Sequence, residues 1–341
     1  MKRIAIIRLS SLGDIIHTLP AFQLLRKRFP EAKITWIVEA PGAALLENFS
    51  GIDEILIFNL KSRKGLSAKI VFLIGFVRRR RRHFDLLIDF QGLIKSALLA
   101  FLLGGTRLGF CAKNTREPMA ALFYSCRAVF FPEERHVILK NIHLLSALGI
   151  HEATIEYPLK ELSASAQLRH LLSELNWPAK RYIILNVGGG WPTKILSANQ
   201  WLEIANGLKH DYPLLLLWGN EQEKETAAAV ARQSGSHLAF FMNFSDLICL
   251  IARALLVISG DTLALHLADM TKTPAVGIFG PSSPQRNGPL FLQSRAVFQK
   301  QECSFCYQRK CATMTCLNEI VIADIIAAVR KIDEWNNRNT D

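Results

Sequence analysis

The 341-residue sequence lacks any apolar run long enough to cross a membrane. Its longest apolar stretches, residues 70–77 and 97–103, fall well short of the roughly 20 residues that a transmembrane helix needs. A secretory signal peptide is not expected either, because the apolar run after Lys2 and Arg3 breaks at Arg8 and no small-residue cleavage site follows. Internal repeats and low-complexity tracts are also absent. The length allows two domains, each with a full hydrophobic core.

The composition lacks the cysteine density of a disulfide scaffold and is short of acidic residues. Seven cysteines, four of them clustered, fit a reducing cytoplasm better than an oxidising compartment. Lys and Arg number 41 against 29 Asp and Glu, which gives a formal net charge of +12. Such an excess implies an anionic partner, whether nucleic acid, acidic lipid headgroups or a phosphorylated substrate.

Extended apolar runs alternate with helical patterns through most of the chain. The expected strands are residues 3–7, 33–38, 54–58, 85–89 and 128–131 in the first half, and 182–187, 214–218, 255–258 and 275–279 in the second. Such alternation predicts parallel sheets covered by helices on both faces. We therefore expect an α/β fold with two Rossmann-like, doubly wound domains.

The domain boundary is expected between residues 155 and 180. A strand-like run at 156–159 is followed there by a polar helix and then by Trp177-Pro178-Ala179-Lys180. We expect a first domain at 1–160, a second at 178–318, and a C-terminal segment at 319–341. The helix of that last segment begins after the second sheet is complete, so packing back on the first domain is one option for it.

The turn after the first expected strand, Ser10-Ser11-Leu12-Gly13-Asp14, lacks the glycines of a nucleotide-binding loop. Neither G-x-G-x-x-G nor G-x-x-x-x-G-K-[ST] occurs there, which disfavours a dinucleotide or P-loop site. Asp14 lies at the start of an expected helix, where backbone N–H groups and the helix dipole stabilise an ionised carboxylate. An ordinary N-cap and a general base in a ligand site both need that ionised form, so both readings stay open.

Two turns in the second half gather groups suited to a phosphorylated ligand. Gly188, Gly189 and Gly190 precede Thr193 and Lys194, a combination able to cradle a diphosphate, although a flexible turn with a solvated lysine is the alternative.

In the second of these turns, Asp261 and Thr262 begin an expected helix and His266 lies about one turn further along. A lone histidine on a helix is more often structural than ligand-binding. Ligands of doubly wound sheets, however, bind beyond the carboxyl ends of the strands, where these groups are expected to converge.

Together these motifs resemble the ADP-heptose:lipopolysaccharide heptosyltransferases, glycosyltransferase family 9, and most closely heptosyltransferase I. The resemblance runs over nearly the whole chain, through residues 10–14 with 17–20, 84–96, 218–221, 260–262 with His266, and 279–281. It implies a GT-B fold, in which two Rossmann-like domains face a cleft, with the acceptor on the first domain and the sugar nucleotide mainly on the second. It also implies an inverting, metal-independent transfer of heptose from ADP-heptose to a Kdo residue of the lipopolysaccharide inner core, with Kdo-lipid A as acceptor and no required cofactor.

The resemblance also implies roles for individual residues. Asp14 is the implied catalytic base. The implied acceptor-binding residues are Ser10, Ser11, Lys61, Arg63 and Lys64, and the implied donor-binding residues are Gly189, Gly190, Thr193, Lys194, Glu221, Met242, Asp261, Thr262 and His266. An inverting displacement needs a base on the face opposite the departing ADP. Cations and the N-terminus of a helix can stabilise the negative charge that grows on the departing ADP. Leu263 and the loop from Gly188 to Lys194 depart from the family's usual pattern.

The segment between Asn59 and Phe84 holds nine basic residues and no acid. The basic residues are Lys61, Arg63, Lys64, Lys69 and the run Arg78 to Arg82, with the apolar stretch 70–77 between them. This pattern is typical of a segment at an interface with anionic headgroups, and a solvated charged face is the alternative. Together with this pattern, the resemblance implies a cytoplasmic enzyme bound peripherally, through residues 61–82, to the inner leaflet of the inner membrane of a Gram-negative bacterium. Nucleic acid is not an expected partner, because the aromatic residues lie mostly within apolar runs.

The four clustered cysteines, Cys303, Cys306, Cys311 and Cys316, have the spacing of a zinc knuckle with cysteine in place of histidine. A structural zinc site and a loop of reduced thiols both remain possible readings, and no catalytic metal is expected.

Two other functions of the chain also remain open. One is a related transferase that uses another nucleotide sugar or acceptor position, and the other is a non-hydrolysing sugar-nucleotide epimerase, which would not need a basic acceptor face.

Overall fold

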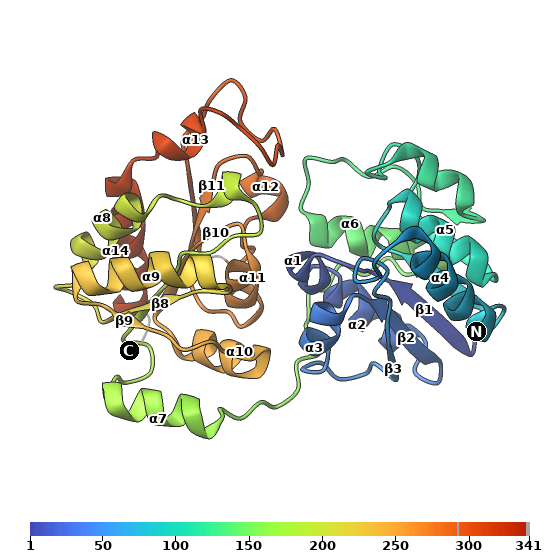
Figure 1. The fold of residues 1–341 in the computed structure, drawn as a ribbon, viewed down its shortest axis with the longest axis horizontal. Coiled ribbons are helices and arrows are strands. Elements are labelled where there is room, and N and C mark those ends of the chain that lie inside the picture. The colour runs from blue at the N-terminus through green and yellow to red at the C-terminus, as the bar shows by residue number, and fades with distance from the viewer. Residues whose placement is uncertain (292, 339–341) are drawn as a thin grey trace. The chain divides into compact units, whose positions relative to one another are not determined.

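The computed structural model of the chain describes residues 1–291 and 293–338. It divides into two compact units, Met1–Glu161 and Leu162–Asp341 (Figure 1). Within the described residues each unit contains one six-stranded sheet in which every strand pair is parallel. The expected α/β architecture of two doubly wound domains is therefore confirmed.

The first sheet has the strand order β3-β2-β1-β4-β5-β6. Its strands are β1 (Arg3–Ile7), β2 (Lys33–Val38), β3 (Glu54–Ile57), β4 (Leu86–Asp89), β5 (Thr106–Gly109) and β6 (Cys126–Arg127). Its helices are α1 (Leu12–Ile16), α2 (Leu19–Arg28), α3 (Ala40–Leu46), α4 (Leu66–Arg80), α5 (Ile94–Leu103), η1 (Pro118–Phe123), α6 (Val137–Leu144) and η2 (Leu145–Leu148). The strand order reverses between β1 and β4, and ligands of such sheets bind beyond the carboxyl ends of the strands at that point.

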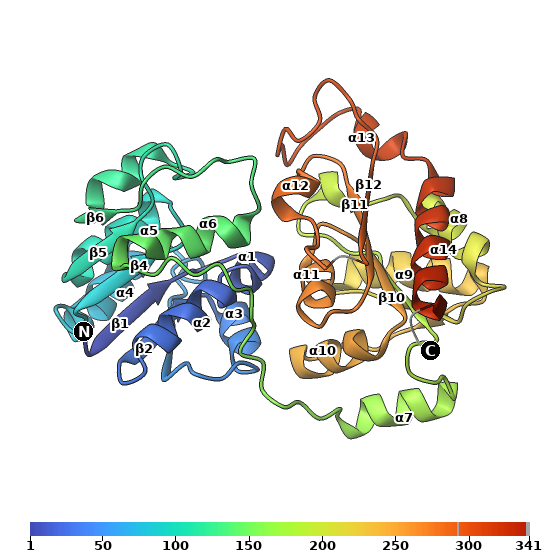
Figure 2. The same ribbon diagram turned by 180° about the vertical axis from the view of Figure 1, so that it is seen from behind.

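The second sheet repeats this topology in the order β12-β11-β10-β7-β8-β9. Figure 2 labels three of its strands, β10, β11 and β12. Its strands are β7 (Ile183–Asn186), β8 (Leu214–Leu217), β9 (His237–Leu238), β10 (Leu256–Gly260), β11 (Ala275–Phe279) and β12 (Arg295–Phe298). Its helices are α7 (Ala166–Leu175), η3 (Pro192–Lys194), α8 (Ala198–Leu208), α9 (Glu221–Ser234), α10 (Phe244–Arg253), α11 (Leu263–Met270), α12 (Pro284–Asn287), α13 (Thr315–Asn318) and α14 (Ile322–Arg338). The reversal lies between β7 and β10, so the loops after these two strands meet at one edge.

Three short strands were not predicted from the sequence, and two predicted strands are wrong. Residues 128–131 follow the two-residue strand β6, and 156–159 contribute one isolated bridge, between Phe49 and Leu159. Strands β5, β9 and β12 were not predicted, because each is only two to four residues long and contains a polar residue, so none shows a long apolar run.

The C-terminal helix α14 packs on the second unit and not on the first domain, which the sequence had left open as one option. Ile322, Ile325, Val329 and Ile332 recur at helical spacing and are buried in the core of the second unit, which α8 also lines. The apolar stripe of α14 is therefore buried within the second unit. Residues 339–341 of the predicted C-terminal segment lie outside the described residues. No helix in the described part of the chain is long and apolar enough to span a bilayer.

Candidate active site

The loop between β1 and α1 holds Asp14 at the carboxyl edge of the first sheet. Gln91, just beyond the neighbouring strand β4, accepts hydrogen bonds at Oε1 from the backbone N–H of Leu9 (2.9 Å) and of Ser10 (3.2 Å). Ser11 precedes α1 and donates its backbone N–H (3.2 Å) and its hydroxyl (3.0 Å) to Oδ2 of Asp14. The turn that carries the predicted base is therefore fixed from two sides.

The second carboxylate oxygen of Asp14 pairs with a buried arginine. Arg8 Nη2 lies 2.6 Å from Asp14 Oδ1, and Arg8 also donates to the carbonyl oxygen of Phe90. Burial raises the pKa of Asp14, but the positive charges of Arg8, Arg116 and His17 outweigh burial and hold this pKa well below its usual range. Asp14 is therefore an ionised, oriented carboxylate that keeps 19% of its side chain exposed.

A second buried carboxylate, Asp89, stabilises the loop that holds Asp14, acting through Gln91. Asp89, the last residue of β4, accepts the backbone N–H groups of Gln91 (2.8 Å) and Gly92 (3.3 Å) at Oδ1 and the Tyr124 hydroxyl (2.7 Å) at Oδ2. Burial raises the pKa of Asp89, and the hydrogen bonds oppose this rise. Asp89 thereby fixes the backbone that presents Gln91 to the first loop.

We expect Tyr124→Phe to lower the free energy of unfolding by about 1–3 kcal/mol, because a buried carboxylate loses its hydroxyl donor. Urea denaturation at neutral pH measures this change. Tyr212→Phe is the matched control, since the Tyr212 hydroxyl donates to a more exposed carboxylate, Asp333, at 2.8 Å. Equal losses in the two variants would contradict a special role for the buried pair.

The predicted acceptor-binding residues lie in loops at this same edge. Lys61, Arg63 and Lys64 follow β3 and are exposed, while Ser10 and Ser11 follow β1. Lys61 Nζ lies 3.1 Å from Glu39 Oε1, and the Arg63 guanidinium lies 4.8 Å from the centre of the Phe72 ring. The loops of parallel strands thus bring a basic group and the candidate base to one edge of the first unit.

In the second unit the loops after β7 and β10 are in contact. Asn186 donates from Nδ2 to the hydroxyls of Ser259 (3.0 Å) and Thr262 (3.1 Å). A Cβ atom at Gly260 would lie 2.9 Å from the carbonyl oxygen of Lys194, so only glycine fits there without a shift. The two predicted donor loops therefore form one structure.

Asp261 joins these loops electrostatically. Its Oδ2 lies 2.6 Å from Lys194 Nζ and accepts from Asn287 Nδ2 at 3.1 Å, while its Oδ1 lies 3.2 Å from His266 Nε2. Burial raises the pKa of Asp261, but the His266 hydrogen bond and the Lys194 charge hold it well below its usual range. Asp261 is thus an ionised anchor for Lys194, and its implied part in donor binding stays a prediction.

The acidic side chain that reaches the glycine loop is Glu223, which was not predicted from the sequence, and the donor-binding role of Glu221 stays a prediction. Glu223 accepts the backbone N–H of Gly189 at 3.3 Å and of Gly219 at 2.7 Å. Glu221 is 80% exposed and lies 3.3 Å from Lys224. Asn220 caps α9 three residues before Glu223, so the N-cap pattern in the sequence contained the signal that identifies Glu223.

The remaining predicted donor residues divide between the loops. Gly190 lies between β7 and η3, Thr193 is buried within η3, and Met242 is half-buried just before α10. Arg8 and Asn287 were not predicted as site residues, because their parts in the two sites arise only from contacts that the fold creates.

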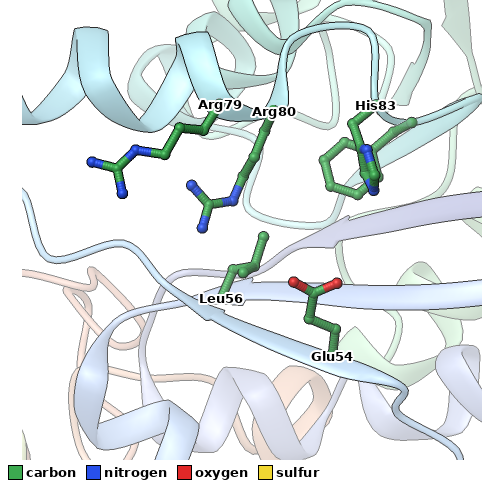
Figure 3. A pocket seen from close by; sticks show the side chains of 6 residues that line it. Glu54, Leu56, Arg79, Arg80 and His83 are labelled. Atoms are coloured by element: carbon green, nitrogen blue, oxygen red, sulfur yellow. The ribbon is translucent and has the colours of Figure 1, made fainter.

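Figure 3 shows a pocket that is lined by residues of the first unit alone. Its lining includes Glu54, Leu56, Arg79, Arg80 and His83, which the figure shows between β3 and the end of α4. Glu54 is the first residue of β3, so the pocket lies at the amino end of that strand, opposite the edge that carries Asp14. We therefore assign it no part in the candidate site.

Comparison with known proteins agrees with this architecture. The model of glycosyltransferase family 9 (heptosyltransferase) matches residues 76–316. Lipopolysaccharide heptosyltransferase 1 of Campylobacter coli is 28% identical over 298 residues, which cover 84% of this chain and 86% of that protein. The protein of the same name from Pseudomonas aeruginosa is 27% identical over 319 residues, 91% of this chain and 87% of that protein.

The fold is shared with solved structures. The structure of Escherichia coli heptosyltransferase WaaC with ADP is 23% identical, covers 97% of this chain and 99% of its own, and aligns with a TM-score of 0.74. A family 9 glycosyltransferase from Veillonella parvula aligns with a TM-score of 0.78 at 21% identity, covering 97% of each chain. These matches confirm the GT-B fold class, and the family model covers well over half of the sequence. The chain therefore belongs to glycosyltransferase family 9, the heptosyltransferases.

Proposed function

We propose that the chain transfers heptose from ADP-heptose to a Kdo residue of the lipopolysaccharide inner core. The observation that carries this proposal is the division of chemistry between the units. The first unit has an oriented, ionised carboxylate at its sheet edge, and the second has a glycine loop with an anchored lysine. The curated relatives are named as lipopolysaccharide heptosyltransferases, and solved relatives contain ADP or ADP-2-deoxy-2-fluoro heptose.

The proposed role of Asp14 is that of general base in an inverting displacement. The acceptor hydroxyl attacks the anomeric carbon, its proton passes to Asp14, and the bond from that carbon to the ADP oxygen breaks on the opposite face. Arg8 orients the carboxylate and keeps it ionised, at the cost of lower basicity. The base therefore works by orientation rather than by a raised pKa.

The proposed role of the second unit is to stabilise the departing ADP. Backbone N–H groups of the glycine loop and of the first turn of α11 donate to the diphosphate, and Lys194 neutralises its growing charge. Asp261 holds Lys194 in place through the ion pair, and Asn287 holds Asp261 through a hydrogen bond. No cofactor takes part in this proposal.

A donor screen with purified protein tests the proposal. We expect mass spectrometry to show addition of one heptose to Kdo-lipid A from ADP-heptose, and both heptose epimers should be supplied. Exclusive use of another nucleotide sugar would contradict the donor assignment. Isomerisation of ADP-heptose without acceptor and without transfer would favour the epimerase.

We also propose that α4 holds the enzyme on an anionic membrane, the cytoplasmic face of the inner membrane. Leu66, Ile70, Val71 and Ile74 are 74%, 47%, 70% and 50% exposed and follow one another at helical spacing. The opposite side of the helix packs inward, where the Phe76 ring lies 5.0 Å from that of Phe58. An exposed apolar stripe that ends in a run of arginines suits an interface of acyl chains and phosphate headgroups.

We expect the triple variant Arg78→Gln, Arg79→Gln, Arg81→Gln to bind anionic vesicles roughly 10²-fold more weakly, since each basic residue near such a surface contributes about 1 kcal/mol. Co-sedimentation with vesicles of phosphatidylglycerol and phosphatidylethanolamine measures this affinity.

The matched control removes the same charge from the second unit, at the exposed residues Lys209, Arg232 and Lys300. This control triple should bind nearly as well as the wild type. An equal loss in both triples would show that net charge alone drives binding, which contradicts a dedicated role of α4.

A further inference from the structure

The arginine run at the end of α4 divides between two sides of the helix. Arg78 comes four residues after Ile74 and so continues the exposed apolar stripe. Arg79 and Arg80 come three and four residues after Phe76, the buried residue of α4, and so lie beside the side that packs inward. Of these three arginines, only Arg79 and Arg80 line the pocket that Figure 3 shows.

The helix side of this pocket is cationic. Figure 3 shows Arg79, Arg80 and His83 on the side of α4 and Glu54 on the side of β3. The Arg80 guanidinium lies 4.3 Å from the centre of the Phe76 ring, and its partial burial and the neighbouring charge of Arg79 lower its pKa. Among the described residues, no carboxylate lies at ion-pair distance from either arginine. Two neighbouring guanidinium groups without such a partner favour a bound anion.

The strand side of the pocket offers a hydrogen-bond acceptor. Glu54 Oε2 lies 2.8 Å from Lys33 Nζ and accepts the Thr35 hydroxyl at 3.5 Å. The hydrogen bond from Lys33 lowers the pKa of Glu54 and outweighs its partial burial, so the carboxylate is ionised and can only accept. Its other oxygen, Oε1, has no hydrogen-bond partner in the part of the chain that the structure describes. Because Lys33 already pairs with the charge of Glu54, a neutral hydroxyl suits Oε1 better than a second ammonium group.

We propose that this pocket binds a glycerophosphate group, with the phosphate on Arg79 and Arg80 and a glycerol hydroxyl on Oε1 of Glu54. Guanidinium groups match phosphate oxygens in charge and geometry, and the His83 ring can donate a further N–H. The pocket has a volume of about 200 Å³. Sites for drug-sized ligands usually measure about 300–1,000 Å³, so the pocket suits a headgroup rather than a nucleotide.

The pocket lies at the opposite end of α4 from the loop that carries the predicted acceptor-binding cations. That loop holds Lys61, Arg63 and Lys64 and ends where α4 begins, after Gly65. The 15 residues of α4 span about 22 Å. A lipid headgroup held in the pocket would fix the far end of the helix and lay its exposed stripe along the bilayer, a consequence that rests on the proposed membrane attachment. Glycerophosphate also occurs free, as glycerol 3-phosphate, and the experiment separates the two sources.

A comparison of two lipids tests the pocket with the unaltered full-length protein. Phosphatidylglycerol and phosphatidylmethanol carry the same charge, but only the first has glycerol hydroxyls. We expect vesicles with phosphatidylglycerol to bind roughly 10-fold more tightly than vesicles with the same fraction of phosphatidylmethanol, the effect of one hydrogen bond to a charged group. Co-sedimentation measures both affinities.

Two double variants locate this preference. Arg79→Gln, Arg80→Gln should lose the preference for phosphatidylglycerol. The matched control, Arg78→Gln, Arg81→Gln, removes the same charge from the same arginine run and should keep the preference, although both variants bind anionic vesicles more weakly. Loss of the preference in both variants, or in neither, would overturn the proposal, with circular dichroism confirming that both are folded.

Calorimetry with glycerol 3-phosphate and with methyl phosphate, which has the same phosphate but no hydroxyl, gives the soluble arm. Tighter binding of glycerol 3-phosphate that Arg79→Gln, Arg80→Gln abolishes and the control retains would identify the free compound as a ligand of the pocket. A preference confined to vesicles would identify the lipid. No preference in either arm would overturn the pocket. Intact binding of glycerol 3-phosphate without binding to either vesicle would support the pocket and count against the proposed membrane attachment.

Discussion

Asp14→Asn lowers kcat for heptose transfer by about 10²–10⁴-fold, the usual contribution of a general base, and leaves the affinity for ADP unchanged. The amide keeps the size of the carboxylate but cannot accept the acceptor proton. ADP affinity should not change, because the residues proposed to bind the nucleotide belong to the second unit. Steady-state kinetics and calorimetry with ADP measure the two quantities.

This variant also loses stability, which needs its own control. Removing one partner of the Arg8–Asp14 pair leaves a buried positive charge, at a cost of about 3–5 kcal/mol. The double variant Arg8→Met, Asp14→Asn removes both charges and should regain part of the stability without regaining kcat. Recovery of kcat together with stability would contradict the role of Asp14 as base.

The depressed pKa of Asp14 also predicts a pH dependence of stability. A carboxylate whose folded pKa lies below its unfolded value stabilises the fold above the unfolded pKa, about 4. That stabilisation is lost as the pH falls through and below this value. The free energy of unfolding of the wild type should therefore decline more steeply in acid than that of the double variant.

Lys194→Met lowers kcat/KM by about 10²–10³-fold and weakens ADP binding, because the departing diphosphate loses its positioned cation. The substitution also leaves Asp261 without the ion pair at 2.6 Å. Lys224→Met is the matched control. Both ammonium groups lie over a tryptophan ring, Lys194 at 4.2 Å from Trp191 and Lys224 at 5.0 Å from Trp218.

Lys224 lies in the first turn of α9, has a side chain that is 44% exposed and pairs with Glu221, so its loss should change kcat/KM less than about 3-fold. Similar losses in both variants would indicate a diffuse electrostatic effect. An effect of Lys194→Met confined to the acceptor KM would contradict its assignment to the donor.

The central strands could be predicted from the sequence because they are continuous apolar runs buried on both faces. Strands β1 and β2 begin and end at the predicted residues, whereas β5, β9 and β12 were missed because they are short and partly polar. The apolar stripe of α14 was recognisable as a helix. A stripe does not specify its partner, and only the structure shows that it is buried against the second unit.

The residues of the candidate site also divide into those that local sequence predicts and those that it does not. Asp14, Lys194 and Asp261 follow strands in short motifs, so their positions could be predicted from local sequence. Arg8 and Glu223 act through contacts with other segments. A carboxylate's partner, and hence its pKa, depends on such contacts, which motif spacing does not determine.

A crystal structure with ADP bound tests most directly whether donor and base belong to different units. We expect the diphosphate against the loop from Gly188 to Lys194 and the start of α11, with Lys194 Nζ bonded to a phosphate oxygen and Asp14 away from the nucleotide. Nucleotide bound in the first unit, against Ser10 to Asp14, would contradict this division and leave the reaction without its proton acceptor.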